Sequence, residues 1–213
     1  MLNLNLDKEF INKKIIVTGA SRGLGAMLCK ALAERGAKLA MLSRSKKEMN
    51  KLISNMKNSS NHVSINVNLL KNKQIVEAIK KAKKFLKNID IVLHVAGGGF
   101  GLKDALVKEN DLKLLFQANL GAAAEINRLI VRDKVKQKTL KLIHVGSTAS
   151  IEAVGSVGYN VVKSALAGYV RSLGRKLIKN KVIVTGILPG VFIAQGNAME
   201  RLKKKIIRLI KNL

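Results

Sequence analysis

The sequence predicts an α/β protein built on one doubly wound parallel sheet. Short runs rich in β-branched residues alternate along the chain with longer segments whose apolar residues recur every three or four positions. This alternation is typical of strand–helix–strand units, whose right-handed crossovers place helices on both faces of a parallel sheet. The 213 residues, 47% of them apolar, are enough for one substantial core, so we expect a single domain over residues 1–213.

Six strands and five helical segments are expected in this order. The predicted strands are Lys14–Thr18, Lys38–Leu42, His62–Val67, Ile89–Val95, Leu140–Val145 and Lys181–Leu188. The predicted helices are Leu24–Arg35, Lys46–Lys57, Lys71–Lys87, Asp111–Asp133 and Val157–Lys179. No internal repeat or low-complexity linker interrupts the order, so nothing in the chain marks a domain boundary.

The charge of the chain is strongly positive. It carries 40 Lys and Arg against 13 Asp and Glu, for a formal net charge of +27. Such a field attracts nucleic acid, anionic lipid or acidic proteins. The lysines are spread along the whole chain, however, and five Phe and two Tyr provide few surfaces on which bases could stack. We therefore do not expect nucleic acid as a partner.

Cysteine and histidine are too sparse for a disulfide scaffold or a metal site. Cys29 is the single cysteine, and it shows no zinc-ligand spacing with His62, His94 or His144. The N-terminal residues lack the apolar run of a signal peptide, and no stretch reaches the roughly 20 apolar residues of a transmembrane segment. We expect a reducing, cytoplasmic location and no metal.

A glycine-rich turn joins the first predicted strand to the first predicted helix. It reads Thr18-Gly19-Ala20-Ser21-Arg22-Gly23-Leu24-Gly25. Glycine lets the backbone turn tightly and approach a pyrophosphate, while the following helix offers free N–H groups and the positive end of its dipole. Taken alone, the spacing equally suits a plain strand–helix turn. After a buried strand and before a helix, it favours a dinucleotide site in a Rossmann-like sheet.

The end of the second strand indicates which dinucleotide is bound. An acidic residue at this point usually binds the ribose 2′-hydroxyl of NAD, but this chain reads Leu42-Ser43-Arg44-Ser45. The guanidinium groups of Arg44 and Arg22 instead suit a 2′-phosphate. We therefore predict that NADP(H) is preferred over NAD(H). The alternative is that Arg44 is one more solvated cation of a very basic protein.

A serine, a tyrosine and a lysine follow the fifth predicted strand. The four-residue spacing of Tyr159 and Lys163 puts both on one face of a helix. An ammonium beside a phenol favours the phenolate, so we expect the pKa of Tyr159 to fall toward neutrality and to suit acid–base chemistry. Ser147 would then donate a hydrogen bond to the substrate oxygen. An isolated pattern of this kind also suits a helix pair and a strand-end turn without catalysis.

Together these motifs resemble those of the short-chain dehydrogenases/reductases. The glycine turn matches that family's TGxxxGxG pattern, and Ser147 with Tyr159 and Lys163 matches its Ser…YxxxK set. Pro189-Gly190 follows the sixth predicted strand, as a Pro-Gly pair does in that family. The resemblance covers residues 15–190, and the motifs occur in the family's order and in the expected elements.

The resemblance implies a role for each matching residue. Tyr159 donates a proton to the substrate carbonyl, Lys163 tunes it and binds the nicotinamide ribose, Ser147 orients the substrate oxygen, and Asn119 completes a proton relay. The cofactor supplies the hydride. The implied cofactor-binding residues are Thr18, Gly19, Ser21, Arg22, Gly23, Leu24, Gly25, Arg44, Asn68, Ala96, Gly97, Tyr159, Lys163, Pro189 and Gly190.

The chain also departs from the family pattern. The fourth strand ends in His94-Val95-Ala96-Gly97 where the family often reads NNAG, and we expect His94 to be a packed strand residue. Asn68 stands where an Asp usually contacts adenine, and Ser150 is a minor rival of Ser147. Residues 191–213 are expected to form a shortened substrate lobe, amphipathic and helical from Asn197 onward.

These features predict an NADP(H)-dependent oxidoreductase that interconverts a ketone and a secondary alcohol. It is similar to 3-oxoacyl-carrier-protein reductases and to reductases of surface-polysaccharide pathways, so the expected substrate is a small or carrier-bound carbonyl compound. The alternatives are a shortened relative that binds cofactor with little or no turnover, and a basic binding module on the same scaffold. The resemblance also implies a homo-dimer or homo-tetramer, because the helices that match Asp111–Asp133 and Val157–Lys179 pack against their symmetry copies in that family.

Overall fold

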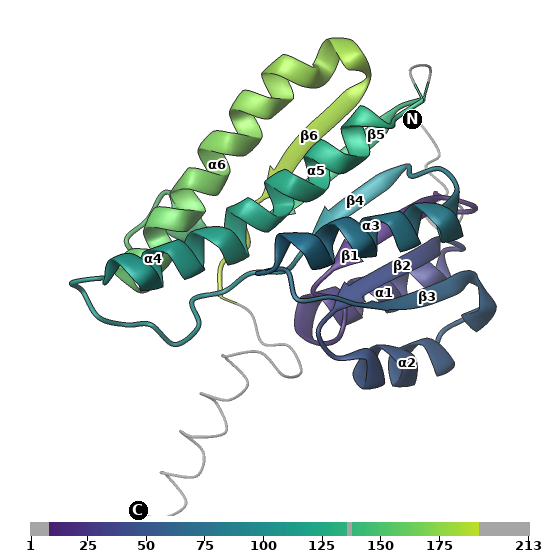
Figure 1. Ribbon diagram of the computed structural model, residues 1–213, viewed down its shortest axis with the longest axis horizontal. Coiled ribbons are helices and arrows are strands. Elements are labelled where there is room, and N and C mark those ends of the chain that lie inside the picture. The colour runs from purple at the N-terminus through teal and green to yellow at the C-terminus, as the bar shows by residue number, and fades with distance from the viewer. Residues whose placement is uncertain (1–8, 136–137, 192–213) are drawn as a thin grey trace, which may run out of the picture.

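Six parallel strands form one sheet in the computed structural model, which describes residues 9–135 and 138–191 (Figure 1). The strands are β1 (Lys14–Thr18), β2 (Lys38–Ser43), β3 (His62–Asn66), β4 (Ile91–His94), β5 (Leu140–Val145) and β6 (Val182–Ile187). Their order in the sheet is β3-β2-β1-β4-β5-β6, and every neighbouring pair is parallel. The predicted doubly wound sheet is confirmed. Its order reverses between β1 and β4, where open α/β sheets bind ligands beyond the carboxyl ends of the strands.

Helices cover both faces of this sheet (Figure 1). They are α1 (Gly23–Glu34), α2 (Lys46–Ser54), α3 (Asn72–Leu86), α4 (Glu109–Phe116), α5 (Ala122–Arg132) and α6 (Val157–Leu177). Short 3₁₀ turns occur at Ser59–Asn61, Thr148–Ser150 and Ile178–Asn180. Helices α1 and α2 contribute to one buried cluster, whereas α3, α5 and the end of α6 contribute to the other.

The two clusters follow from the alternation of side chains along each strand. In β1, Ile15 and Val17 belong to the cluster beneath α1 and α2, while Ile16 belongs to the cluster beneath α3 and α5. All three are fully buried, which explains why this strand reads as a continuous apolar run. The central strands are thereby fixed in position, and their carboxyl ends form a rigid edge.

The expected single helix over Asp111–Asp133 is wrong in one respect. A π-helical turn, Gln117–Gly121, separates α4 from α5. The side chain of Asn119 lies in this turn, and its Nδ2 donates to the carbonyl of Leu115, 2.9 Å away. The extra residue per turn leaves the apolar pattern nearly unchanged, so the pattern reads as one continuous helix.

The sheet ends at β6 among the described residues. No described strand pairs with its outer side, and Ile183 and Ile187 are 40% and 48% exposed. The expected amphipathic helix and shortened substrate lobe fall on residues 192–213, which lie outside the described part of the chain.

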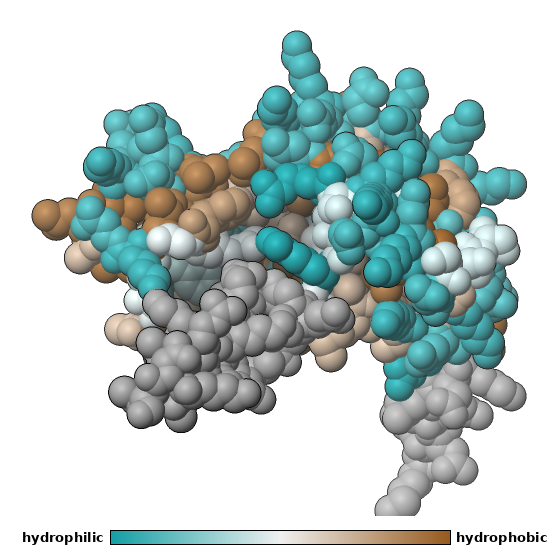
Figure 2. Space-filling view, turned by 90° about the horizontal axis from the view of Figure 1, so that it is seen from below, coloured by the Kyte–Doolittle hydropathy of each residue, from teal (hydrophilic) through white to brown (hydrophobic). Residues whose placement is uncertain are grey.

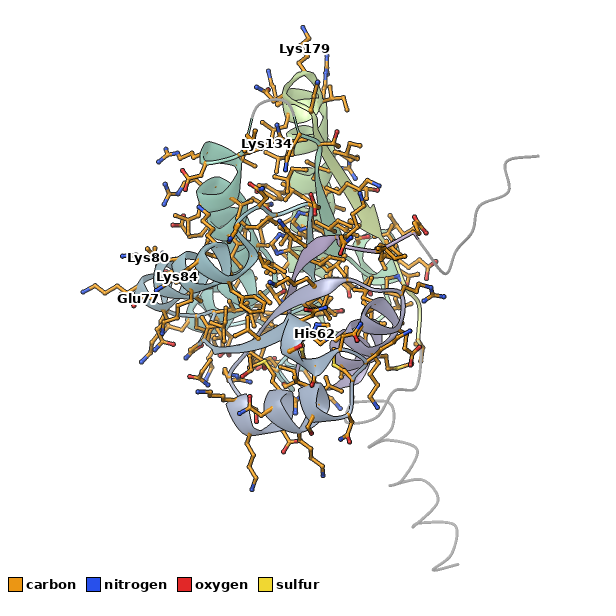
Figure 3. The ribbon with its side chains drawn as sticks, turned by 90° about the vertical axis from the view of Figure 1, so that its right-hand side faces the viewer. His62, Glu77, Lys80, Lys84, Lys134 and Lys179 are labelled. Atoms are coloured by element: carbon orange, nitrogen blue, oxygen red, sulfur yellow. The ribbon has the colours of Figure 1, made fainter. Side chains whose placement is uncertain are left out.

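The lysines point outward in several directions. Lys80 and Lys84 project from α3 beside Glu77, whereas Lys134 and Lys179 lie at another end of the molecule (Figure 3). The positive charge is therefore not confined to one face. No helix in the described part of the chain is long and apolar enough to cross a membrane.

Candidate functional site

A cleft of about 1560 Å³ lies along the carboxyl ends of the strands, at the reversal between β1 and β4. Figure 2 shows the molecule from below Figure 1, with hydrophobic residues gathered on the side of α4 and α6 and hydrophilic residues toward α1 and α2. The glycine turn and the end of β2 line one half of the cleft. The loops after β4 and β5, the start of α6 and Pro189-Gly190 line the other half.

Two glycines of the turn occupy positions where any larger residue would force the neighbouring backbone to shift. Gly19 has a φ of +68°, and a Cβ there would lie 2.9 Å from the backbone nitrogen of Ala96. A Cβ on Gly25 would lie 2.2 Å from the carbonyl oxygen of Gly19. The close approach of α1 to the end of β1 therefore depends on glycine.

The N-terminus of α1 faces the cleft and suits an anion. Gly23, Leu24 and Gly25, the first residues of this helix, line the cleft. Among the described residues no side chain caps the helix, and its first turn contains no acidic residue. Its free N–H groups and the positive end of its dipole are thus available to a phosphate.

Polar side chains surround the end of β2. Ser21 and Ser43 are joined by a hydrogen bond of 2.8 Å between their hydroxyl groups, and both line the cleft. Arg22 and Arg44 line the same end and are exposed, and neither forms an ion pair with a described residue. Among the described residues that line the cleft, Glu48 is the single acidic one. The two arginines therefore provide free donors for an anionic group.

Thr18 does not line the cleft, unlike the other residues of the glycine turn that were predicted to bind cofactor. It is 1% exposed, and its Oγ1 accepts hydrogen bonds from the backbone N–H groups of Val95 (3.1 Å) and Ala96 (3.2 Å). Its side chain joins the end of β1 to the end of β4. Asn68 does line the cleft, and its Oδ1 accepts from the backbone N–H of Leu70 at 3.0 Å.

Asn119 lies behind the loop that follows β4. It is 3% exposed and does not line the cleft. Its Oδ1 accepts from the N–H of Gly98 and its Nδ2 donates to the carbonyl of Gly98, both at 3.0 Å. A Cβ on Gly97 would lie 2.6 Å from Asn119 Oδ1 and 3.6 Å from Lys163 Nζ. Asn119 therefore fixes the backbone of this loop beside Lys163.

Ser147, Tyr159 and Lys163 come together in the cleft. Lys163 is buried, its Nζ donates to the carbonyl of Val145 at 3.0 Å, and it lies 5.6 Å from the centre of the Tyr159 ring. Ser147 accepts from the N–H of Ala149 at 3.2 Å and hydrogen bonds to the Tyr159 hydroxyl. The predicted rival, Ser150, does not line the cleft and donates to the carbonyl of Ser147.

The prediction that the pKa of Tyr159 falls toward neutrality is wrong in this structure. Burial raises the pKa of Tyr159, and the hydrogen bond with Ser147 lowers it by less. Burial also lowers the pKa of Lys163 to about 8. Desolvation disfavours the phenolate and the ammonium alike, and for Tyr159 it outweighs the opposing effect of Ser147.

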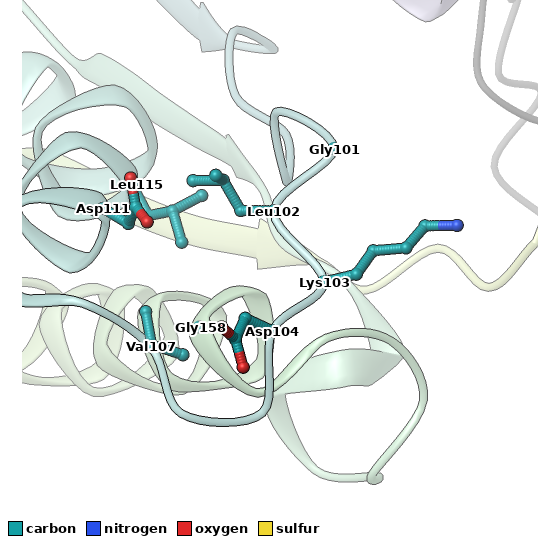
Figure 4. Close-up of a pocket in the computed structure, with 8 residues that line it drawn as sticks. All are labelled: Gly101, Leu102, Lys103, Asp104, Val107, Asp111, Leu115 and Gly158. Atoms are coloured by element: carbon teal, nitrogen blue, oxygen red, sulfur yellow. The ribbon is translucent and has the colours of Figure 1, made fainter.

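The structure adds cleft residues that the motifs did not reveal. They include the loop Gly99 to Lys103, which follows β4, and Val154 to Ser156 before α6. A smaller pocket of about 160 Å³ lies between this loop, α4 and α6, and Lys103 points away from its other lining residues (Figure 4). The glycine run after β4, at the carboxyl edge of the sheet, was the available sequence signal for the first of these segments.

Comparisons with known proteins agree with this geometry. A family model described as short chain dehydrogenase matches residues 13–205. The 3-oxoacyl-[acyl-carrier-protein] reductase FabG of Vibrio cholerae is 27% identical over 180 residues, which cover 84% of this chain and 72% of the relative.

Many solved structures share the fold, among them the following two complexes with a nicotinamide cofactor. L-sorbose reductase from Gluconobacter frateurii, complexed with NADPH and L-sorbose, matches with a TM-score of 0.79 and 19% identity. The match covers 88% of this chain and 73% of the reductase chain. The 3-ketoacyl-(acyl-carrier-protein) reductase of Brucella melitensis, complexed with NADH, matches with a TM-score of 0.77 and 18% identity. The match covers 86% of this chain and 77% of the Brucella chain.

Proposed function

The chain belongs to the short chain dehydrogenase family of NAD(P)-dependent oxidoreductases, and we propose that it uses NADP(H) to interconvert a ketone and a secondary alcohol. The observation that carries the proposal is the shared cleft. One cavity holds an uncapped helix N-terminus at a glycine turn together with Ser147, Tyr159 and Lys163. The first feature suits the phosphates of a dinucleotide, and the second suits proton transfer to a carbonyl oxygen.

The described residues fit a nicotinamide dinucleotide. The missing side chains at Gly19 and Gly25 let α1 start close to the end of β1, and the first residues of α1 line the cleft, where their N–H groups suit a pyrophosphate. At about 1560 Å³ the cleft exceeds the usual 300–1,000 Å³ of a ligand pocket, which leaves space for cofactor and substrate together. When bound, the cofactor supplies the hydride.

The proposed preference for NADP(H) rests on the two arginines of the cleft. Arg22 and Arg44 lie at the end of β2 and have no ion-pair partner among the described residues. Guanidinium groups bind phosphate through paired hydrogen bonds. One of the two solved structures above carries NADPH and the other NADH, so this chain's own side chains support the preference better than the relatives do.

The side chains of the second half suit reduction of the carbonyl. Because burial raises the pKa of Tyr159, its phenol stays protonated at neutral pH and is ready to donate to a carbonyl oxygen. Ser147, already hydrogen bonded to that phenol, is placed to orient the same oxygen. Lys163, with a pKa of about 8, is mostly cationic at neutral pH and favours negative charge that develops beside it.

We propose a small or carrier-bound carbonyl substrate, of the 3-oxoacyl thioester or keto-sugar type. The printed functions of the Vibrio and Gluconobacter relatives support these two classes. The test is oxidation of NADPH, followed by its absorbance, with a panel of 3-oxoacyl thioesters and keto sugars. Turnover of any member supports the proposal. Tight NADPH binding without turnover of any member would contradict it and would identify a cofactor-binding protein.

We further propose that residues 1–213 form one domain and assemble into a homo-dimer or homo-tetramer. Apolar side chains are exposed on α4, on α6 and before α6, among them Phe116 (46%), Ile151 (73%) and Val161 (48%). Helix faces of this kind often pack against a symmetry copy. Light scattering should show a mass above the monomer, reduced by Val161→Glu but not by Val76→Glu, which alters a similarly exposed valine of α3.

A cytoplasmic location is part of the same proposal. Cys29 is a buried free thiol, which suits a reducing compartment.

A further inference from the structure

Four polar side chains from four elements meet in the core beside Lys163. His94 belongs to β4, Asn127 to α5, His144 to β5 and Tyr169 to α6. His94, Asn127 and His144 are 5%, 2% and 1% exposed, and Tyr169 is half-buried. Polar groups at this depth are costly unless they are paired, so the network needs a physical explanation.

The amide of Asn127 connects the other three side chains. Its Oδ1 lies 2.8 Å from His94 Nε2, and its Nδ2 lies 3.3 Å from His144 Nε2 and 3.1 Å from the Tyr169 hydroxyl. An amide oxygen only accepts and an amide nitrogen only donates. His94 must therefore carry its proton on Nε2, and His144, if neutral, must carry it on Nδ1.

The two imidazoles are also in direct contact. Their rings stack with centres 4.4 Å apart, and the Tyr169 ring meets His144 edge-on. Protonation of either ring would place a cation against its partner, and Lys163 on α6 repels a charge on His144. Burial lowers the pKa of His94 to about 4 and also lowers that of His144, so both rings are neutral at physiological pH.

The network lies where the two catalytic segments leave the sheet. His94 and His144 are paired in register across β4 and β5. The chain continues from His94 into the loop whose Gly98 is held by Asn119, and from His144 into Val145, whose carbonyl binds Lys163. A shift of either strand end would therefore displace groups that line the cleft.

We propose that His94, Asn127 and His144 are positioning residues for the catalytic centre. Their hydrogen bonds and stacking hold the ends of β4 and β5 together. The Val145 carbonyl thereby keeps Lys163 beside Tyr159, and the segment after β5 keeps the Ser147 hydroxyl beside Tyr159. The inference rests on the proposed reductase activity. The competing interpretation is a network that stabilises the core and has no influence on the reaction.

Two substitutions of His94 separate these interpretations. Glutamine places an amide nitrogen the same number of bonds from the backbone as Nε2 and can still donate to Asn127, whereas leucine cannot. We expect His94→Leu to lower kcat about tenfold to hundredfold, with a smaller change in KM, because small displacements of catalytic groups are costly. His94→Gln should recover most of the lost kcat.

The matched control is His62, a second buried strand histidine. It lies in β3, at the other edge of the sheet, and hydrogen bonds to the carbonyl of Lys57 (Figure 3). His62→Leu should lower the melting temperature but leave kcat unchanged. Equal kcat losses in His62→Leu and His94→Leu, or wild-type kcat in His94→Leu, would overturn the proposal.

A spectroscopic measurement tests the network without any turnover. Nitrogen-15 shifts of the imidazoles in the full chain should show His94 and His144 neutral, with opposite tautomers, at both pH 7 and pH 5.5. Titration of either ring between these pH values would overturn the proposal. A wild-type protein that reduces no ketone would refute the proposed function instead, and the imidazole shifts would still decide the arrangement of the network.

Asn127→Asp supplies a pH profile that a purely structural role would not change. A carboxylate between the rings favours their charged forms, so the network should take up a proton near neutrality. We expect kcat of this variant to fall below about pH 7, where the wild-type profile stays flat. The proposal would be overturned if the pH profile of kcat stayed flat in a variant whose imidazoles are shown to be charged by their nitrogen-15 shifts. If this variant does not fold, the two His94 variants decide the question.

Discussion

The two halves of the cleft are built in different ways. Around β1, α1 and β2 the cleft is lined by the glycine turn and by exposed side chains such as Arg22 and Arg44, and its shape depends on missing side chains at Gly19 and Gly25. Around β4, β5 and α6 it presents the side chains of Ser147, Tyr159 and Lys163, and buried amides lie behind it, since Asn119 bonds the backbone of Gly98 and Asn127 bonds the Tyr169 hydroxyl. The first half presents fixed N–H groups, and the second presents titratable groups.

This difference predicts where each half is vulnerable. A turn whose shape depends on missing side chains tolerates no added volume. A site made of buried polar side chains tolerates little loss of hydrogen bonding, because each unpaired partner carries a desolvation cost. Substitutions in one half should therefore change cofactor affinity, and substitutions in the other half should change turnover.

The largest effect is expected for Tyr159→Phe. Loss of the phenolic proton should reduce kcat by about 10²–10⁴ while NADPH affinity changes by no more than a few-fold, because the phosphates bind at the other half. Steady-state kinetics and a fluorescence titration of NADPH measure the two quantities. Tyr169→Phe, which removes one partner of Asn127, should cost less. Equal losses of affinity and turnover in Tyr159→Phe would contradict the division between the halves.

Acid should destabilise the protein through the catalytic half. The pKa of His94 is about 4 in the folded protein and about 6.5 in an unfolded chain, so between these values the unfolded state binds more protons. The free energy of unfolding should therefore fall as the pH decreases from 6.5 to 4, by about 3 kcal/mol from this residue. Urea denaturation at pH 7 and pH 4 measures the fall. If the free energy of unfolding of His94→Gln fell by the same amount, the loss of stability would belong to other groups.

Gly25→Ala should damage the phosphate half. The added Cβ would lie 2.2 Å from the Gly19 carbonyl, so the turn must shift, at a cost of about 1–3 kcal/mol in stability and with weaker NADPH binding. Gly168→Ala is the control, because its Cβ meets no atom within 4 Å in the middle of α6. That change should stabilise the helix by about 0.5–1 kcal/mol. Unchanged NADPH affinity in Gly25→Ala would argue against a cofactor at this turn.

The smallest effect is expected for Arg44→Asp. Loss of an exposed guanidinium should weaken NADPH binding by about 1–2 kcal/mol, roughly five- to thirtyfold, with little change for NADH. Lys47→Asp makes the same change of charge at an α2 residue that does not line the cleft, and it should leave the ratio of the two affinities unchanged. Equal binding of NADPH and NADH by the wild-type protein would refute the proposed preference.

Much of this site was predictable because its signals are local. The bounds of β1 and β5 agree with the predicted strands, since short buried runs of β-branched residues are strong patterns. The glycine turn, and the four-residue spacing that puts Tyr159 and Lys163 on one helix face, are contiguous in the chain. Each depends on residues a few positions apart, which the sequence itself specifies.

Other features depend on packing between distant segments. The π turn at Asn119, the inward position of Thr18 and the raised pKa of Tyr159 all follow from which groups surround these residues. The sequence by itself determined the order of elements and the turn that suits phosphate. Only the tertiary structure decided that β4 lies beside β5 and that His94 therefore stacks on His144, because sheet order and burial are set by the packing of the whole chain.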